Sequence, residues 1–384
     1  MPAKVKPATG RFAASPGRGR AMIRAPRRSV SWPGVPLALA AALLFGASAP
    51  FAKALLGSGI NPRLLAGLLY LASGLGLAVL RLARRTLGTA PAEAPLTRFD
   101  LPSLGLIVLF GGIAGPALLM LGLNATPAAT AALLLNLEGP ATMAIAWLAY
   151  RENVDRRLLA GAAAILAGTV LLSWRGGPKE AGWGTLAIAG ACLAWGIDNN
   201  LTRRLSAADP VDLALSKGLA AGSVNFALAL AGGAMLPGLG GLAGAAAVGF
   251  LGYGLSLVLF VLALRHLGAA RTGAYFSTAP FIGAVLAVPL FGEPVTARLA
   301  AGGALMALGV ALHLTEAHEH EHRHEAVAHA HRHVHDLHHR HAHGPDDPPG
   351  EPHAHRHRHL PLVHRHPHYP DLHHRHRHPP GGAA

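Results

Sequence analysis

The segment ENVDRRLLAGAAAILAG (residues 152–168) recurs in similar form as EPVTARLAAGGALMALG (residues 293–309), and this repetition indicates the architecture of the chain. At a constant spacing of 141 residues, Glu152, Val154, Arg157, Leu158, Gly161 and Gly168 match Glu293, Val295, Arg298, Leu299, Gly302 and Gly309. Near the start of each half, Lys53 and Leu55 match Arg203 and Leu205 at a spacing of 150. Alanine-rich sequence produces chance matches, but an aligned set of charges and glycines indicates an internal duplication.

The apolar residues lie between positions 34 and 314 and nearly vanish on either side. The whole chain is 51% hydrophobic and 14% charged, whereas a soluble domain carries about 25% charge. At roughly 20 residues per span, the apolar part predicts an all-α integral membrane protein with ten transmembrane helices. The expected helices are 35–56, 64–82, 102–122, 128–149, 157–174, 182–202, 212–232, 243–264, 271–291 and 296–314.

Five helices per half would turn the second half upside down in the membrane, which is the inverted repeat typical of secondary transporters. Both ends of the chain are poor in apolar residues and are expected to be disordered. The chain is therefore divided into a basic tail (1–32), a first five-helix repeat (33–176), a second five-helix repeat (177–315) and a histidine-rich tail (316–384).

The first expected helix follows a basic segment, as the apolar part of a signal peptide does. Ala47-Ser48-Ala49 resembles a cleavage site, but Pro50 follows it directly. We therefore expect this helix to be retained as a membrane span.

Basic residues in the loops predict the orientation. With a cytoplasmic N-terminus, eleven arginines fall in cytoplasmic loops and four basic residues fall on the opposite side. The first group is Arg81, Arg84, Arg85, Arg98, Arg151, Arg156, Arg157, Arg203, Arg204, Arg265 and Arg271, and the second is Arg63, Arg175, Lys179 and Arg298. This bias predicts a bacterial-type inner-membrane protein with both termini in the cytoplasm. The net charge of +14 lies beside the spans, which favours contact with anionic lipid over nucleic acid.

Each half also has an aromatic-glycine pair in its first helix, Phe45-Gly46 and Trp195-Gly196, and a proline before the repeated glutamate, Pro140 and Pro280. Together with the Glu…Gly…Gly pattern, these features resemble the EamA branch of the drug/metabolite transporter superfamily over residues 33–315. The resemblance implies a ten-helix carrier that moves a small metabolite or drug across the inner membrane, often outward. The family's repeated motifs are mainly structural, and the histidine-rich tail lies outside its pattern.

Ionisable groups at membrane depth are costly and mark functional positions. Glu138 lies near the middle of the fourth expected helix, two residues before Pro140, which removes a backbone donor and frees a carbonyl. We interpret Glu138 as a proton or cation site. The alternative is a protonated carboxyl group paired to a neighbouring helix. Asn136, on a different face of the helix, is the weaker candidate.

The sixth expected helix carries Asp198, Asn199 and Asn200, with Asp198 about 6 Å from the cytoplasmic end. Lys217 lies at a similar depth in the next helix. The structural interpretation is an Asp198–Lys217 ion pair, and the functional one is a polar patch at the inner mouth of the substrate pathway. Both can hold, because a pair that breaks on substrate binding is a usable gate.

Polar residues of the ninth expected helix complete the predicted substrate site. Tyr275, Ser277 and Thr278 lie just before Pro280, and Thr278 aligns with Glu138 across the repeat. Such hydroxyls often bond only to the carbonyl one turn earlier, yet the repeat relates the two regions about a central axis, and we expect the binding site there. The expected helix breaks are Pro50, Pro140 and Pro280.

Four charged residues near helix ends have structural interpretations. Lys53 and Arg203 are expected to extend to the membrane interface. Glu152 and Glu293 are expected to stabilise the start of their own helices.

No catalytic motif is visible. The sequence contains no GxSxG, no HExxH and no phosphate loop with GK[ST], and its single cysteine, Cys192, excludes a CxxC site. We therefore expect no enzyme activity and no required cofactor. No segment could form the nucleotide-binding domain of an ATP-driven pump, so transport is expected to draw on an ion or substrate gradient.

The tail holds 23 of the 25 histidines, and neutral imidazole binds Ni, Co and Zn. The expected metal ligands are His318, His320, His322, His338, His339, His341, His373, His374 and His376. The alternative is a low-complexity tail that swells or contacts lipid as its histidines protonate near pH ~6.5.

Three functions fit the sequence. The first is a secondary-active exporter of a small metabolite or drug. The second is a Ni, Co or Zn transporter with a metal-buffering cytoplasmic tail. The third is a membrane metal sensor that does not transport. The expected partners are lipid, a small-molecule substrate, a divalent transition metal and a second copy of the chain, without nucleic acid.

Overall fold

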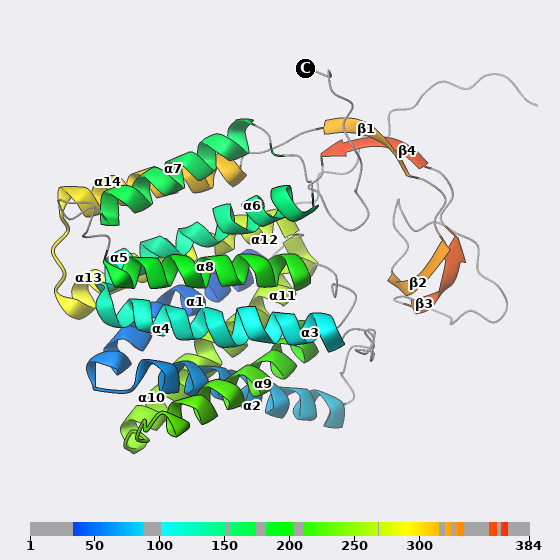
Figure 1. Cartoon of the computed structure of the whole chain (residues 1–384). Helices are drawn as coiled ribbons and strands as arrows, with labels where there is room; N and C mark the ends of the chain where they lie inside the picture. The colour runs from blue at the N-terminus through cyan, green and yellow to red at the C-terminus, as the bar shows by residue number, and fades with distance from the viewer. Residues whose placement is uncertain are drawn as a thin grey trace, which may run out of the picture.

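The computed structural model describes residues 34–87, 101–150, 154, 156–173, 182–202, 210–267 and 269–314, and the tail segments 319–324, 328–333, 353–358 and 362–367. Its helices form one bundle in which neighbours run parallel or antiparallel (Figure 1).

The first half of the chain contributes α1 (Gly34–Gly57), α2 (Pro62–Thr86), α3 (Leu101–Ile107), the π-helical segment η1 (Val108–Ala114), α4 (Gly115–Ala125), α5 (Ala128–Leu134), the 3₁₀ segment η2 (Leu135–Leu137), α6 (Glu138–Tyr150) and α7 (Arg156–Ser173). The second half contributes α8 (Trp183–Thr202), α9 (Pro210–Ala231), α10 (Leu239–Gly249), the π-helical segment η4 (Phe250–Leu255), α11 (Ser256–Leu267), α12 (Ala269–Phe276), α13 (Ala279–Phe291) and α14 (Ala297–Leu314).

Eight helical stretches in the described residues are long and apolar enough to cross a membrane. They are α1, α2, α3–η1–α4, α5–η2–α6, α7, α9, α10–η4–α11 and α14. The other two expected helices correspond to α8, whose polar end lowers its hydropathy, and to α12 and α13, of which α13 has only 13 residues. The count of ten spans and the inverted orientation of the halves stay predictions.

The two halves interrupt their helices at corresponding places. The third helix of each half passes through a π-helical segment that contains two buried glycines, Gly111 and Gly112 in η1 and Gly252 and Gly254 in η4. The fourth helix of each half is interrupted near its proline, by η2 before Pro140 and by the break between α12 and α13 before Pro280. Irregular backbone at membrane depth is tolerated only where it is buried in protein.

Pro50 departs from the expected helix breaks, because α1 continues through it. The proline leaves the Gly46 carbonyl without its helical donor. That carbonyl lies against Gly283 of α13, so close that a Cβ on Gly283 would come within 2.7 Å of it. Close packing of a neighbouring helix therefore covers the exposed carbonyl and keeps α1 helical.

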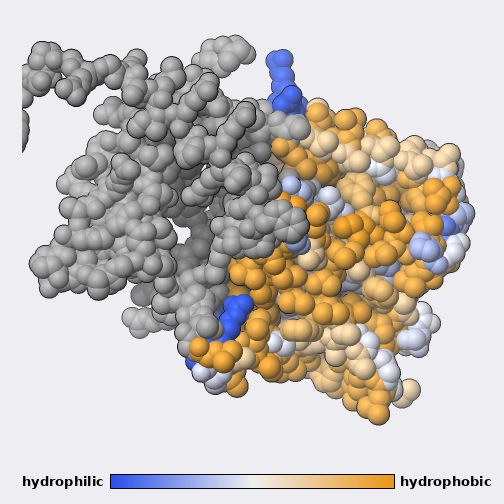
Figure 2. Space-filling view, turned by 180° about the vertical axis from the view of Figure 1, so that it is seen from behind, coloured by the Kyte–Doolittle hydropathy of each residue, from blue (hydrophilic) through white to orange (hydrophobic). Residues whose placement is uncertain are grey.

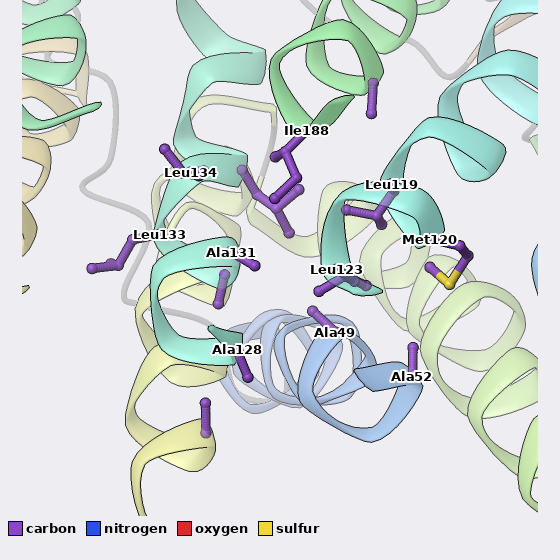
Figure 3. Close-up of a cluster of buried hydrophobic side chains, with 14 of the residues drawn as sticks. Ala49, Ala52, Leu119, Met120, Leu123, Ala128, Ala131, Leu133, Leu134 and Ile188 are labelled. Carbon is purple, nitrogen blue, oxygen red and sulfur yellow. The ribbon is translucent and has the colours of Figure 1, made fainter. Parts of the chain in front are cut away.

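The core is built from small residues where α1, α5 and α13 meet. Ala49 of α1 lies near Ala128 of α5, whereas Ala52 lies farther along α1, toward Met120 of α4 (Figure 3). At Gly46 an added Cβ would come within 2.3 Å of the Ala279 carbonyl oxygen. Small side chains let helix backbones approach closely, which is how membrane helices gain packing energy in lipid.

The outside of the bundle is apolar. One face is covered almost continuously by hydrophobic residues (Figure 2). Large exposed apolar side chains lie along several helices and include Leu75, Val79, Leu148, Val170 and Val285. A soluble monomer rarely exposes so much apolar surface, so with its eight apolar spans the chain is a multi-pass membrane protein.

The tail differs from the expected lack of structure at four short segments. β1 (Glu319–His324) pairs antiparallel with β4 (Leu362–Pro367), and β2 (Ala328–His333) pairs antiparallel with β3 (His353–Arg358). In these segments histidine often alternates with another residue, and such an alternating pattern suits an extended backbone. Pairing of two strands then satisfies the hydrogen bonds of their backbone N–H and C=O groups. Of the predicted metal ligands, His320 and His322 lie in β1, and the other seven lie outside the described residues.

Candidate functional site

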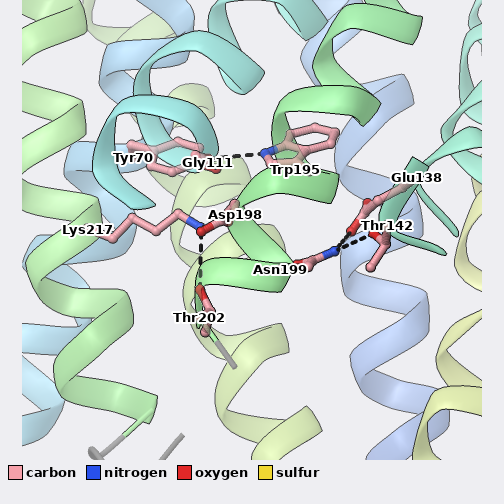
Figure 4. Close-up of polar contacts among 9 residues, drawn as sticks. All are labelled: Tyr70, Gly111, Glu138, Thr142, Trp195, Asp198, Asn199, Thr202 and Lys217. Atoms are coloured by element: carbon pink, nitrogen blue, oxygen red, sulfur yellow. Dashed lines mark hydrogen bonds and ion pairs between the residues drawn. The ribbon is translucent and has the colours of Figure 1, made fainter. Parts of the chain in front are cut away.

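The last two turns of α8 bring polar side chains into the middle of the bundle (Figure 4). Asp198 forms an ion pair with Lys217 of α9, and the two side chains are 6% and 20% exposed. Thr202, one turn further along α8, donates to the other Asp198 oxygen at 3.2 Å. The predicted pair between these neighbouring helices is thus present, and it places two opposite charges in the interior.

Glu138 and Asn199 join α6 to α8. Asn199 Nδ2 donates to Glu138 Oε1 at 2.8 Å and to Thr142 Oγ1 at 3.2 Å (Figure 4). Glu138 is the first residue of α6 and follows the η2 segment directly. The two predicted residues therefore meet across the two halves of the chain, and Thr142, which sequence reasoning missed, completes the contact.

The side-chain oxygen of Asn200 is a hydrogen-bond acceptor without a donor in the described structure. Asn200 Nδ2 donates to the Gly196 carbonyl at 2.8 Å and to the Thr142 carbonyl at 3.0 Å. Its Oδ1 is buried and has no hydrogen-bond partner in the described structure. A buried acceptor without a donor costs about 1–3 kcal/mol, which makes this atom a natural contact for a water molecule or a solute.

The η1 segment supplies carbonyl acceptors to three other helices. The Gly111 carbonyl accepts from Tyr70 Oη of α2 at 3.0 Å and from Trp195 Nε1 of α8 at 3.1 Å. Asn225 Nδ2 of α9 donates to the Gly112 carbonyl at 3.1 Å. The signals in the sequence were the glycine pair and an asparagine inside an apolar helix, but a π-helical segment has no clear sequence pattern.

An aromatic cluster adjoins this network through Tyr70. The ring centroids of Tyr70 and Tyr253 are 5.6 Å apart, those of Tyr253 and Phe45 are 6.0 Å apart, and those of Phe45 and Phe276 are 5.2 Å apart. The four rings come from α2, η4, α1 and α12. An apolar aromatic surface therefore lies next to the charged groups.

The predicted residues of the ninth helix do not join this network through Thr278. The Thr278 hydroxyl is exposed and donates to the Tyr275 carbonyl in its own turn at 2.6 Å, and Ser277 lies between them in the same turn. Asn136 likewise donates to the Leu133 carbonyl of its own span, at 2.8 Å. Short hydroxyl and amide side chains compete successfully for local carbonyls.

The described residues contain no group of three or more His, Cys, Asp or Glu side chains that could hold a metal ion. Cys192 is buried, with its Sγ 3.7 Å from the Leu134 carbonyl oxygen. His313 lies at the end of α14, with its Nε2 3.0 Å from the Leu158 carbonyl oxygen. The polar network of the bundle is therefore one of carboxylate, amine, amide and hydroxyl groups.

Two segments of the chain, residues 32–174 and 182–315, each match the EamA-like transporter family. An uncharacterized transporter of Methanothermobacter thermautotrophicus is 28% identical over 287 residues, which cover 71% of this chain and 83% of that protein. A crystal structure of a protein with 21% identity has a TM-score of 0.54 and is similar over 74% of this chain and 96% of that one, which shows the fold alone. Because the family matches extend over both helical halves and most of the sequence, the chain belongs to the EamA-like transporter family.

Proposed function

We propose that this transporter is a secondary-active exporter of a small organic metabolite or drug, located in a bacterial-type inner membrane with both termini in the cytoplasm. One observation carries the proposal. The Glu138–Asn199 contact joins the first half of the chain to the second near the middle of the α5–α6 span. If one half moves against the other, this contact must break and reform, which is the behaviour required of a solute site in alternating access.

The distribution of charge supports Glu138 as the group that binds the coupling proton or a cationic group of the solute. Asp198 and Lys217 neutralise each other, whereas Glu138 accepts from the neutral amide of Asn199. Among the residues that the structure describes, no ion pair to Glu138 is formed. An unpaired carboxylate inside a membrane is costly. Binding of a proton or a cation to Glu138 would remove or offset that buried negative charge.

The aromatic residues support an organic solute over a bare ion. Trp195 lies one helical turn before Asn199 on α8 and shares the Gly111 carbonyl with Tyr70 of the aromatic cluster. Aromatic side chains provide large apolar contact areas, and binding sites commonly combine such surface with a few polar groups. The solute class favoured here is an amine-bearing molecule with an apolar body.

Efflux of ethidium, a cationic aromatic dye, and export of amino acids from dipeptide-fed cells test the function. Cells with the full chain should lose both kinds of solute, or one of them, faster than cells without it. Glu138→Gln should slow that efflux at least tenfold, because one lost charge contact is worth about 1.4 kcal/mol or more. Thr169→Val is the matched control, since the Thr169 hydroxyl donates only to the Ile165 carbonyl of its own helix.

Two results would count against the proposal. If the full chain exports neither ethidium nor amino acids, the organic exporter is abandoned. If Glu138→Gln exports as fast as the starting chain, Glu138 is removed from the pathway.

The second candidate is transport or buffering of Ni, Co or Zn, and the histidine content of the tail, 23 of the 25 histidines in the chain, favours it. The antiparallel β2–β3 register sets His329, His331 and His333 opposite His357, His355 and His353. Histidine is a common ligand of transition metals, but no group of three or more metal ligands is found among the described residues. We rank this candidate second, because the described residues of the bundle contain no cluster of metal ligands. A non-transporting metal sensor would use the same tail.

Metal content of cells separates these alternatives. Cells with the full chain, or with a chain that ends at Leu314, are exposed to Ni, Co or Zn, and their metal is measured. A metal transporter would change the metal content of cells that express either chain. A buffering tail would change the metal content only of cells that express the full chain. A sensor binds metal when purified and changes neither. If the metal content of the cells is unchanged and the purified protein binds no metal, then metal transport, metal buffering and metal sensing are all excluded.

A further inference from the structure

The connection between α4 and α5 consists of Thr126 and Pro127, and a charged side chain contacts each helix end beside it. Lys53 of α1 donates from its Nζ to the carbonyls of Leu123 at 2.5 Å and Asn124 at 3.0 Å. These carbonyls belong to the last turn of α4, where helix carbonyls lack intrahelical donors. Lys53 therefore caps the negative end of α4, a more specific position than the membrane interface expected for it.

Glu293 caps the facing end of α5. One carboxylate oxygen accepts from the backbone N–H of Ala128 at 2.5 Å, and the other accepts from that of Ala129 at 2.9 Å. Pro127, the residue before the helix, provides no side-chain cap. The expectation that Glu293 stabilises its own helix is wrong, because α14 begins only at Ala297 and the carboxylate lies at the N-terminus of α5.

The backbone ties Glu293 to the end of α13. That helix ends at Phe291 and is capped by Gly292, whose φ of +62° lies in the left-handed region that favours glycine. The Glu293 N–H then donates to the Val288 carbonyl at 3.1 Å. A short, well-anchored turn of the second half thus presents a carboxylate to a helix of the first half.

The capped end of α5 lies on the same span as the polar network. Glu138 comes ten residues after Ala128, about 15 Å along the span, with the η2 segment between them. At the capped end, Ala49 of α1 lies near Ala128 of α5 (Figure 3). This tight packing and the two caps close the bundle on one side of the network.

We propose that Lys53 and Glu293, together called the α4–α5 latch, are positioning residues that hold this end of the carrier closed. For solute to pass here, the Glu293 carboxylate must leave the N-terminus of α5, so that the start of the span can separate from α13. This proposal rests on the proposed carrier function and adds to it the residues that keep one end of the carrier closed. With the orientation predicted from the loops, the latch lies on the non-cytoplasmic side.

Cys192 provides a built-in reporter of this opening. It is the single cysteine of the sequence, and it is buried on α8, with its Sγ 3.7 Å from the Leu134 carbonyl oxygen of α5. It lies seven residues before Asn199 on α8, on the latch side of the polar network. A thiol reagent that enters from the latch side reaches Cys192 only when α5 and its neighbours separate.

The test compares labelling of Cys192 in the full chain by a membrane-impermeant methanethiosulfonate, in intact cells and in inside-out vesicles. Glu293→Gln keeps the size of the side chain but removes its charge, and Glu293→Asp keeps the charge. Arg63→Gln is the matched control, because Arg63 is an exposed charge at the same end of the bundle, in the first turn of α2.

The latch predicts that Glu293→Gln raises the labelling rate about fivefold, the population shift expected from losing one charge–helix-end interaction. The rise should occur from one side of the membrane only, with Glu293→Asp and Arg63→Gln close to the starting rate. A merely structural role would loosen the bundle and raise labelling from both sides. That result, or an unchanged rate, overturns the proposal. The measurement needs no solute, so its failure is distinct from failure of the export assays.

Discussion

Asp198 and Lys217 show at the scale of single residues why charges are kept inside this bundle. Their pairing offsets the cost of desolvating each charge, but removal of one partner leaves the other buried and uncompensated. The neighbouring Glu138 has no such partner among the described residues. The two carboxylates therefore differ in kind, one held by a fixed ion pair and the other available to change its partner.

The buried pair predicts a pattern of stabilities. Asp198→Asn and Lys217→Met should each destabilise the protein by about 3–5 kcal/mol, and the double variant should recover most of that loss. Thermal unfolding of the purified variants checks this. The partly exposed Arg81–Asp212 pair, whose N–O distance is 2.6 Å, is the control, and Asp212→Asn should cost less than about 1 kcal/mol. A double variant no more stable than the weaker single one would show that the buried charges are not coupled.

The sequence predicted the ionisable residues of the site but not all their partners. Asp198 and Lys217 could be paired from their depth in adjacent helices. Glu138 was identified from its depth and from the nearby Pro140, but Asn199 could not be predicted as its partner, because that contact depends on how α6 and α8 are rotated about their axes. The Thr278 hydroxyl donates to a carbonyl within its own turn, as short hydroxyl side chains often do, and its place in the substrate pathway stays a prediction.

At the scale of elements, hydropathy predicted the helices well, because apolar length alone defines a span. The expected helix 35–56 corresponds to α1 at Gly34–Gly57, and 102–122 corresponds to α3–η1–α4 at Leu101–Ala125. Hydropathy could not predict the π-helical segments, since they change the hydrogen-bond pattern without changing the apolar content. Nor could it show that Pro50 leaves α1 unbroken, which depends on close packing against Gly283.

The close packing around the η1 segment predicts the effect of replacing its Gly111 by alanine. A Cβ at Gly111 would lie 2.1 Å from Asp198 Oδ2 and 2.7 Å from Oδ1. Gly111→Ala should therefore displace Asp198 from Lys217 and destabilise the protein by about 1–3 kcal/mol. Gly105→Ala, in α3 of the same expected span, has open space around its Cβ and should be neutral or gain up to ~1 kcal/mol from helix propensity. Equal unfolding temperatures for the two variants would contradict the crowding at Gly111.

At the scale of the whole molecule, one buried core joins both halves of the chain. Leu119 and Leu134 of the first half share it with Ile188, Ala284 and Met306 of the second. Each half matches the family by itself, yet each leaves an apolar face that only the other half covers. The two segments that match the family thus pack against each other through a shared core.

This shared core predicts the behaviour of a split chain. Residues 1–173 and 182–384, expressed separately, should each fail to give soluble, monodisperse protein in detergent, because each exposes its half of the core. Expressed together, they should copurify through a tag on one fragment. Size-exclusion chromatography checks both outcomes. A single fragment that purifies as a stable monomer would show that the halves do not depend on each other.

The alanines between α5 and α13 have a further consequence for the speed of a transport cycle. Alanine has no side-chain rotamers to lose, so burying or exposing it carries almost no side-chain entropy. Where Ala132 meets Gly283, with 3.1 Å between the Ala132 Cβ and the position of an added Cβ, the two faces are smooth and almost rigid. They can part and meet again without any search through side-chain conformations. We therefore expect the rate of such a cycle to depend more on the polar bonds at the end of α5, such as those of Glu293, than on this alanine–glycine contact.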